Sequence, residues 1–229
     1  MGKTIFVVNS NEVTLAEIVK HLKNDTDYEI VFDTDVGVDV NKIESITQYF
    51  DTIDLHAVII PEPEHICVSI EDANDEQWEQ AFNKGALISM LMTRAAGEYF
   101  KSKNHGGAII YLGSIHTEKP TGGDFLFSIQ CSATQLMCRE AALAYGKYGV
   151  NCFYVQRGII DSDIEKVGVI SNIYSSTGLR YPKMQTPKAD YLNGLIDFLL
   201  TDAASPLNGS DIKADEGLTM YYGNRGDRR

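Results

Sequence analysis

Short runs of β-branched and aromatic residues alternate along this chain with longer segments of helical periodicity. The expected strands are residues 4–8, 29–32, 57–60, 108–112, 151–155 and 211–214. The expected helices are residues 15–22, 43–50, 78–101, 127–145 and 191–200. Strands that alternate with helices pair in parallel through right-handed crossovers, which places helices on both faces of the sheet. The sequence therefore predicts a Rossmann-like, doubly wound α/β fold with three αβα layers.

The length and composition favour one domain over residues 1–229. Hydrophobic residues make up 44% of the 229 residues, which is enough for one full core. We find no linker long enough to divide the chain, and no internal repeat. Residues 222–229 are polar, and we expect them to form a flexible tail.

The charge excludes two classes of partner. A net charge of -12 and a pI of about 4.8 argue against nucleic-acid binding and against attachment to an anionic membrane. No apolar run reaches the roughly 20 residues that span a bilayer, and the first residues suggest a strand rather than a signal peptide. We therefore expect a cytoplasmic protein. A solvated surface is the simplest interpretation of the spread acidic residues, for example Glu62, Glu64, Asp72, Asp75 and Glu76.

The four cysteines do not form a pair with the spacing of a zinc or redox motif. They are Cys67, Cys131, Cys138 and Cys152. Without a close Cys-x-x-Cys pair, we interpret them as buried free thiols of a cytosolic protein.

The second half of the chain resembles the short-chain dehydrogenase/reductases, a resemblance that extends over nearly the whole length. Ser114 ends an expected strand, Phe127 follows thirteen residues later and Cys131 four residues after that, and a helix then leads to residues 148–151. In that family a serine and a tyrosine hold the substrate oxygen, and a lysine lowers the pKa of the tyrosine. Here Phe127 and Cys131 stand at the tyrosine and lysine positions, and Gly85 at that of a catalytic asparagine. The resemblance therefore implies that no catalytic residues remain.

The same resemblance places a dinucleotide site after the first strand. The family's three phosphate-binding glycines fall on Asn9, Val13 and Leu15. Side chains at Val13 and Leu15 would fill the space that a pyrophosphate needs, and Glu12 would repel it. Asp33 matches the acidic residue that grips the ribose of NAD. The region after Asp33 is also short by about one strand–helix unit, so we expect this chain to bind no cofactor.

Two other kinds of site could replace the family's catalytic residues. Ser114 and His116 could form a nucleophile and base, but the chain leaves the strand between them, which disfavours a directed hydrogen bond. His65 and His116 with Glu62 and Glu64 could bind a metal, but such residues scattered over two loops are usually surface residues. We therefore predict no metal site.

These observations lead to one functional hypothesis. We expect a catalytically silent subunit that pairs with an active paralogue through residues 78–101 and 127–145, with NAD bound in the partner. A similar arrangement exists in the two-subunit dehydrogenase of anaerobic toluene degradation, whose substrate is a hydroxyacyl-CoA. The alternatives are a variant active NAD(P)-dependent oxidoreductase and a small-ligand-binding module.

Overall fold

The computed structural model describes residues 3–161, 163, 181–183 and 185–220. It contains a six-stranded parallel sheet with the order β2-β1-β3-β4-β5-β6. The strands are β1 (Thr4–Val7), β2 (Glu29–Phe32), β3 (Leu55–Ile60), β4 (Gly107–Ser114), β5 (Val150–Arg157) and β6 (Ser210–Ala214). The Rossmann-like fold is confirmed. The expected tail at 222–229 lies outside the described residues.

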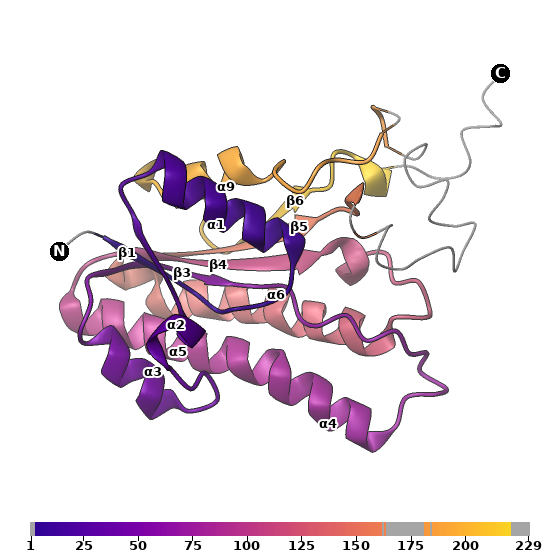
Figure 1. Ribbon diagram of the computed structural model, residues 1–229, viewed down its shortest axis with the longest axis horizontal. Coiled ribbons are helices and arrows are strands. Elements are labelled where there is room, and N and C mark those ends of the chain that lie inside the picture. Colours follow the sequence, from indigo (N-terminus) through magenta and orange to yellow (C-terminus); the bar gives the residue numbers. More distant parts are fainter. Residues whose placement is uncertain (1–2, 162, 164–180, 184, 221–229) are drawn as a thin grey trace.

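Helices cover both faces of this sheet (Figure 1). One layer contains α1 (Val13–Asp25) and α9 (Asn193–Leu199), and the other contains α3 (Ile43–Phe50), α5 (Ala86–Lys103) and α6 (Phe125–Tyr145). The remaining elements are α2 (Asp33–Val36), α4 (Asp75–Lys84), η1 (Ile115–Thr117), η2 (Gly146–Tyr148), η5 (Asp202–Leu207) and η6 (Leu218–Met220). Because successive strand residues point to opposite faces, Ile5 packs in the α1 layer and Phe6 in the α5 layer.

The single helix expected over 78–101 was wrong, because the chain breaks at Gly85 into α4 and α5. Gly85 has φ −111° and ψ −84°, which are not helical angles. The helix α6 passes so close that a Cβ at Gly85 would lie 1.8 Å from Oε1 of Gln130. The break therefore lets the two helices approach α6 at different points along its length.

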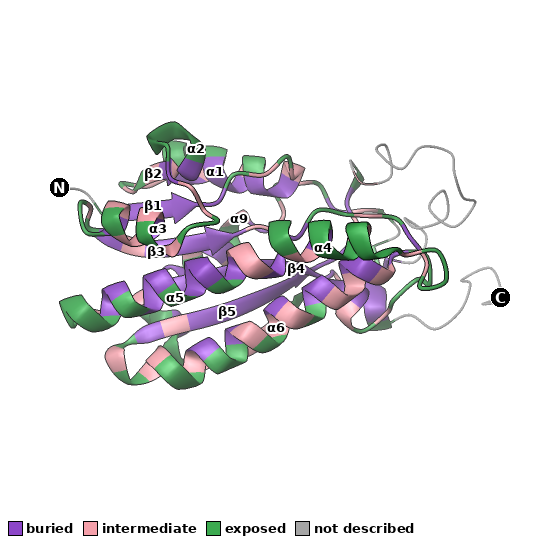
Figure 2. Ribbon diagram, turned by 90° about the horizontal axis from the view of Figure 1, so that it is seen from below, coloured by how far each residue is buried: buried purple, intermediate pink, exposed green. Residues whose placement is uncertain are grey.

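The burial pattern corrects two further expectations (Figure 2). Cys131, Cys138 and Cys152 are buried free thiols as expected, but Cys67 is exposed because it lies in the loop between β3 and α4. Glu62 is buried rather than solvated, because it pairs with Arg157. None of the helices in the described ranges is long and apolar enough to span a membrane.

Gly113 supplies a direct test of this packing. A methyl group at Gly113 would lie 2.1 Å from the ring of Tyr154, which is fully buried and donates a hydrogen bond to the Cys131 carbonyl over 3.0 Å. We expect Gly113→Ala to lower the free energy of unfolding by about 1–3 kcal/mol, measured by urea denaturation.

Gly194→Ala is the matched control. Gly194 lies in α9 with no atom within 4 Å of an added Cβ, so we expect stabilisation of up to about 1 kcal/mol. Equal urea midpoints for Gly113→Ala and the unsubstituted protein would contradict the packing described here.

Candidate functional site

A cleft of about 610 Å³ lies at the carboxyl ends of the strands. All parallel strands end at the same edge of the sheet, which is where open α/β sheets bind ligands. The cleft is lined by residues at or after the ends of β1, β2, β3, β4 and β5 and by the start of α6, among them Glu12, Asp33, Glu62, His65, Ser114, His116, Phe127, Arg157 and Asp163.

In the turn after β1, the side chain of Glu12 caps the N-terminus of α1. The two oxygens of Glu12 accept the backbone N–H groups of Thr14, over 3.0 Å, and Leu15, over 2.6 Å. These N–H groups at the start of α1 are the donors that bind an anion at a helix N-terminus. The carboxylate of Glu12 is therefore the anion that this helix binds.

The expectation that the side chains of Val13 and Leu15 would fill the phosphate space was wrong, because neither residue lines the cleft. Leu15 is buried in the core between α1 and the sheet. The backbone N–H of Asn9 donates a 2.6 Å hydrogen bond to Asp33, and Asp33 is itself buried. Burial raises the pKa of Asp33, and this hydrogen bond partly opposes the shift. Asp33 thus ties the end of β2 to the turn after β1.

A buried ion cluster surrounds Arg157 at the end of β5. Its Nε lies 2.8 Å from Oε2 of Glu62, its Nη1 lies 2.6 Å from Oδ2 of Asp163, and its Nε lies 3.6 Å from Glu12. Burial alone would lower the pKa of Arg157, but the three carboxylates raise it and keep the side chain charged. Burial raises the pKa of Glu62 to about 7, against the attraction of Arg157 and with the support of Glu12 and Asp163.

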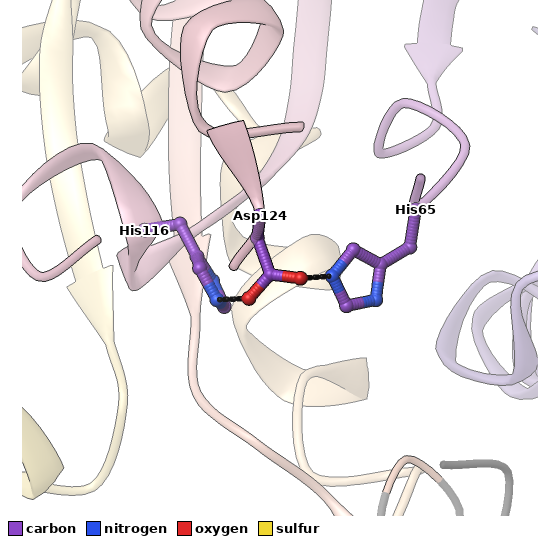
Figure 3. Close-up of side chains that lie close together, drawn as sticks. All are labelled: His65, His116 and Asp124. Carbon is purple, nitrogen blue, oxygen red and sulfur yellow. Dashed lines mark hydrogen bonds and ion pairs between the residues drawn. The ribbon is translucent and has the colours of Figure 1, made fainter. Parts of the chain in front are cut away.

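Four polar side chains meet beside this cluster. Nδ1 of His116 lies 2.9 Å from Oγ of Ser114, and Asp124 lies between His116 and His65 with one oxygen toward each ring (Figure 3). Oδ1 of Asp124 is 2.7 Å from Nε2 of His65, and Oδ2 is 3.5 Å from Nε2 of His116. The expectation that Ser114 and His116 would not meet was wrong, because η1 folds His116 back toward the strand end.

This arrangement allows proton transfer between Ser114 and His116. Burial lowers the pKa of His116, so its ring is neutral near pH 7 and can accept a proton. Burial would raise the pKa of Asp124, but a hydrogen bond from Thr121 and the nearby His65 outweigh it and lower the pKa. Asp124 is therefore ionised.

The two positions that correspond to the family's tyrosine and lysine have other roles. Phe127 is buried, and its ring centroid lies 4.5 Å from that of His65 and 5.1 Å from that of His116. Cys131 is fully buried, and burial raises the pKa of its thiol well above the usual value, so it carries no charge near pH 7. Gly85 also lines the cleft, at the break between α4 and α5.

Sequence reasoning did not find Asp124. It precedes α6, eight residues after His116 and 59 after His65. The only local signal is the Gly122-Gly123 pair, where Gly122 has φ +85° and turns the loop back. Glu62 and Glu64, which were weighed as partners of the two histidines, do not join this group: Glu62 pairs with Arg157, and Glu64 with Lys84.

The fold and the motif spacing agree with the comparison against protein families. The model described as enoyl-(acyl carrier protein) reductase, of the short-chain dehydrogenase type, matches residues 1–219. The chain belongs to the short-chain dehydrogenase/reductase superfamily. Among curated relatives, the L-rhamnose 1-dehydrogenase (NAD(P)(+)) of Sphingomonas sp. is 25% identical over 147 residues, covering 61% of this chain and 56% of the relative.

A second curated short-chain dehydrogenase relative, the cyclopentanol dehydrogenase of a Comamonas species, is 24% identical over 152 residues, covering 66% of this chain and 60% of the relative. The chain thus spans less than two thirds of the length of these relatives.

Two of the similar solved structures illustrate the shared fold. An oxidoreductase of Burkholderia thailandensis has a TM-score of 0.82 at 15% identity, covering 99% of this chain and 95% of that one. A gluconate 5-dehydrogenase of Burkholderia cenocepacia, in complex with NADP and tartrate, has a TM-score of 0.81 at 14% identity, covering 96% of each chain.

The Glu12 cap can be tested by its effect on stability. Glu12→Ala leaves the N–H groups of Thr14 and Leu15 without their acceptor. We expect the free energy of unfolding to fall by about 0.5–2 kcal/mol, measured by urea denaturation. Glu17→Ala is the control, because Glu17 lies in the same helix and makes a surface contact with Lys20, so its loss should cost less than about 0.5 kcal/mol. Equal effects of the two substitutions would show that the cap contributes nothing.

Proposed function

We propose that this chain is a short-chain dehydrogenase-type subunit without dehydrogenase activity of its own, which pairs with an active paralogue. The observation that carries this proposal is the carboxylate of Glu12 on the N-terminus of α1. In Rossmann folds the pyrophosphate of the cofactor binds at that helix N-terminus. A dinucleotide here would meet a carboxylate that already satisfies the same N–H groups, so the residues present do not fit NAD(P).

The chemistry of the cleft supports the same conclusion. Carbonyl reduction or alcohol oxidation of the family type needs a proton donor whose pKa is lowered by a nearby charge. Phe127 has no acidic proton, and Cys131 is a fully buried thiol whose pKa burial raises well above its usual value. In the pair, NAD and the oxidation of an alcohol or hydroxyacyl-CoA would belong to the partner subunit.

The proposed surface for the partner consists of α5 and α6. Most of the apolar side chains expected to contact a partner pack into the chain's own core, including Leu91, Met92 and Ala95. Three large apolar side chains of these helices stay exposed: Met90, Leu136 and Leu143. They fit the paired helices through which, by the family resemblance, short-chain dehydrogenases assemble.

Isothermal titration calorimetry with NAD and NADP tests the loss of the cofactor site. We expect no binding at millimolar cofactor, whereas an active short-chain dehydrogenase run in parallel should bind in the micromolar range. Micromolar binding to this chain would overturn the proposal, because it would require the turn after β1 to release Glu12.

Co-expression with a short-chain dehydrogenase encoded beside this gene tests the pairing. We expect a mixed complex that dissociates when Leu136→Asp and Leu143→Asp are combined, measured by size-exclusion chromatography with light scattering. Ile70→Asp is the matched control, because Ile70 is equally exposed but lies in the loop before α4. A stable homodimer that ignores the second chain would contradict the proposal.

One observation favours a second candidate, a variant active oxidoreductase. The 2.9 Å contact between Ser114 and His116 places a titratable ring beside the family's serine, and the curated relatives are dehydrogenases. A small-ligand-binding module is a third candidate, which the volume of the cleft favours. The NAD(P) titration separates the variant oxidoreductase from the other two.

A further inference from the structure

His65, His116 and Asp124 come from three different loops and converge on one point. His65 follows β3, His116 lies in η1 after β4, and Asp124 immediately precedes α6. The ligand atoms that they offer all lie within 4.8 Å of one another. Figure 3 shows the carboxylate of Asp124 between the two rings.

The buried ring of His116 makes a hydrogen bond at one of its two ring nitrogens. Its side chain is 10% exposed, and its Nε2 makes no hydrogen bond within the described part of the chain. Nδ1 is bound to Oγ of Ser114. Nε2 therefore faces Oδ2 of Asp124 at 3.5 Å. When Nδ1 carries the ring proton, the lone pair of Nε2 is available to a metal ion, and a histidine nitrogen and a carboxylate oxygen at this spacing can share one.

From this geometry we propose that His65, His116 and Asp124 bind a divalent transition-metal ion of the Zn²⁺ type. Zinc bonds to histidine and carboxylate ligands are about 2.0–2.2 Å long, which sets tetrahedral ligand atoms about 3.3 Å apart. Oδ1 of Asp124 lies 2.7 Å from Nε2 of His65, and Oδ2 lies 3.5 Å from Nε2 of His116, both close to that spacing. The ligand atoms of the three residues all lie within 4.8 Å of one another, so binding requires the side chains to close around the ion.

The atoms around the three ligands support the proposed ligation. Ser114 holds Nδ1 of His116 by a hydrogen bond, which leaves Nε2 toward Asp124, and Thr121 donates a hydrogen bond to Oδ2 of Asp124. Such supporting hydrogen bonds orient metal ligands. The ring of Phe127 packs against both histidines and shields one side of the site from water.

The open side of the site faces the cleft. His65 and His116 both line it, together with Ser114. Three protein ligands leave a coordination position for water or a small molecule, which is the pattern of zinc sites that bind ligands. Imidazole and carboxylate are borderline and hard ligands, a set that suits Zn²⁺ better than Cu⁺.

A Ser–His–Asp nucleophile is the competing interpretation of the same side chains, and it fits less well. It needs the hydroxyl of Ser114 to donate to Nδ1 of His116 and Nε2–H to donate to Asp124. In this structure Nε2 and Oδ2 are 3.5 Å apart, an ion-pair contact that is longer than the hydrogen bond a triad uses. Asp124 instead makes its 2.7 Å contact with the second histidine, His65, which a nucleophile relay does not require.

Calorimetric titration of the chelator-treated full chain with Zn²⁺ tests the proposal. We expect one site per chain with micromolar or tighter affinity. His65→Ala, His116→Ala and Asp124→Asn should each weaken binding by more than the about 10- to 100-fold that the loss of a supporting hydrogen bond costs. His21→Ala is the matched control, because His21 makes the same 2.7 Å contact with a carboxylate, that of Asp197, and should bind Zn²⁺ as the unsubstituted chain does.

A second measurement guards against loss of fold. Far-ultraviolet circular dichroism should be unchanged in His65→Ala, since His65 is about one third exposed. Ser114→Ala should weaken Zn²⁺ binding by about 10- to 100-fold, whereas Thr117→Ala, in the same turn, should not. Binding by His65→Ala and Asp124→Asn equal to that of the unsubstituted chain, or Zn²⁺ affinity weaker than millimolar, would overturn the proposal.

Discussion

The parallel sheet is the constraint from which the rest of this structure follows. Parallel strands need a crossover between them, so every strand ends at the same edge and every helix returns outside the sheet. In this chain the ends of β1, β3, β4 and β5 therefore bring Glu12, Glu62, Ser114 and Arg157 into one cleft. Residues distant in sequence become neighbours without any local signal for their meeting.

Several residues at this edge of the sheet bind one another. Glu12 closes the helix that would hold a phosphate, and Arg157 joins Glu12 to Glu62 and Asp163. Each of these bonds is internal to the chain. The part of the cleft around Arg157 is thus held by ion pairs within the chain, while the part around His65, His116 and Asp124 holds the proposed metal ligands.

The fold was predictable from sequence because its signals are local. The strands and most helices follow from runs of apolar residues with the periods of strand and helix. The break at Gly85 was not predictable, because it depends on the approach of Gln130 from a helix 45 residues further along the chain. A glycine inside an apolar helical pattern does not by itself predict a break in the helix.

Sequence reasoning predicted only those site residues that the spacing of the family motif identifies. Ser114, Phe127 and Cys131 follow from that spacing, but the contact between Ser114 and His116 depends on the turn of η1. Asp124 depends on the loop through Gly122, and its two histidines lie in different loops. Long-range side-chain contacts of this kind require the folded backbone, since no pairwise sequence spacing encodes them.

The charges that line the cleft also favour some solutes over others. The described residues that line it include five carboxylates, those of Glu12, Asp33, Glu62, Glu64 and Asp163, against the two fixed cations Lys84 and Arg157. Even with Glu62 protonated, the balance is negative, and low-dielectric walls concentrate the resulting field at the opening. This balance disfavours polyphosphates and other polyanions in the cleft and favours cationic or uncharged solutes. The charge of a solute therefore affects how readily it enters the cleft.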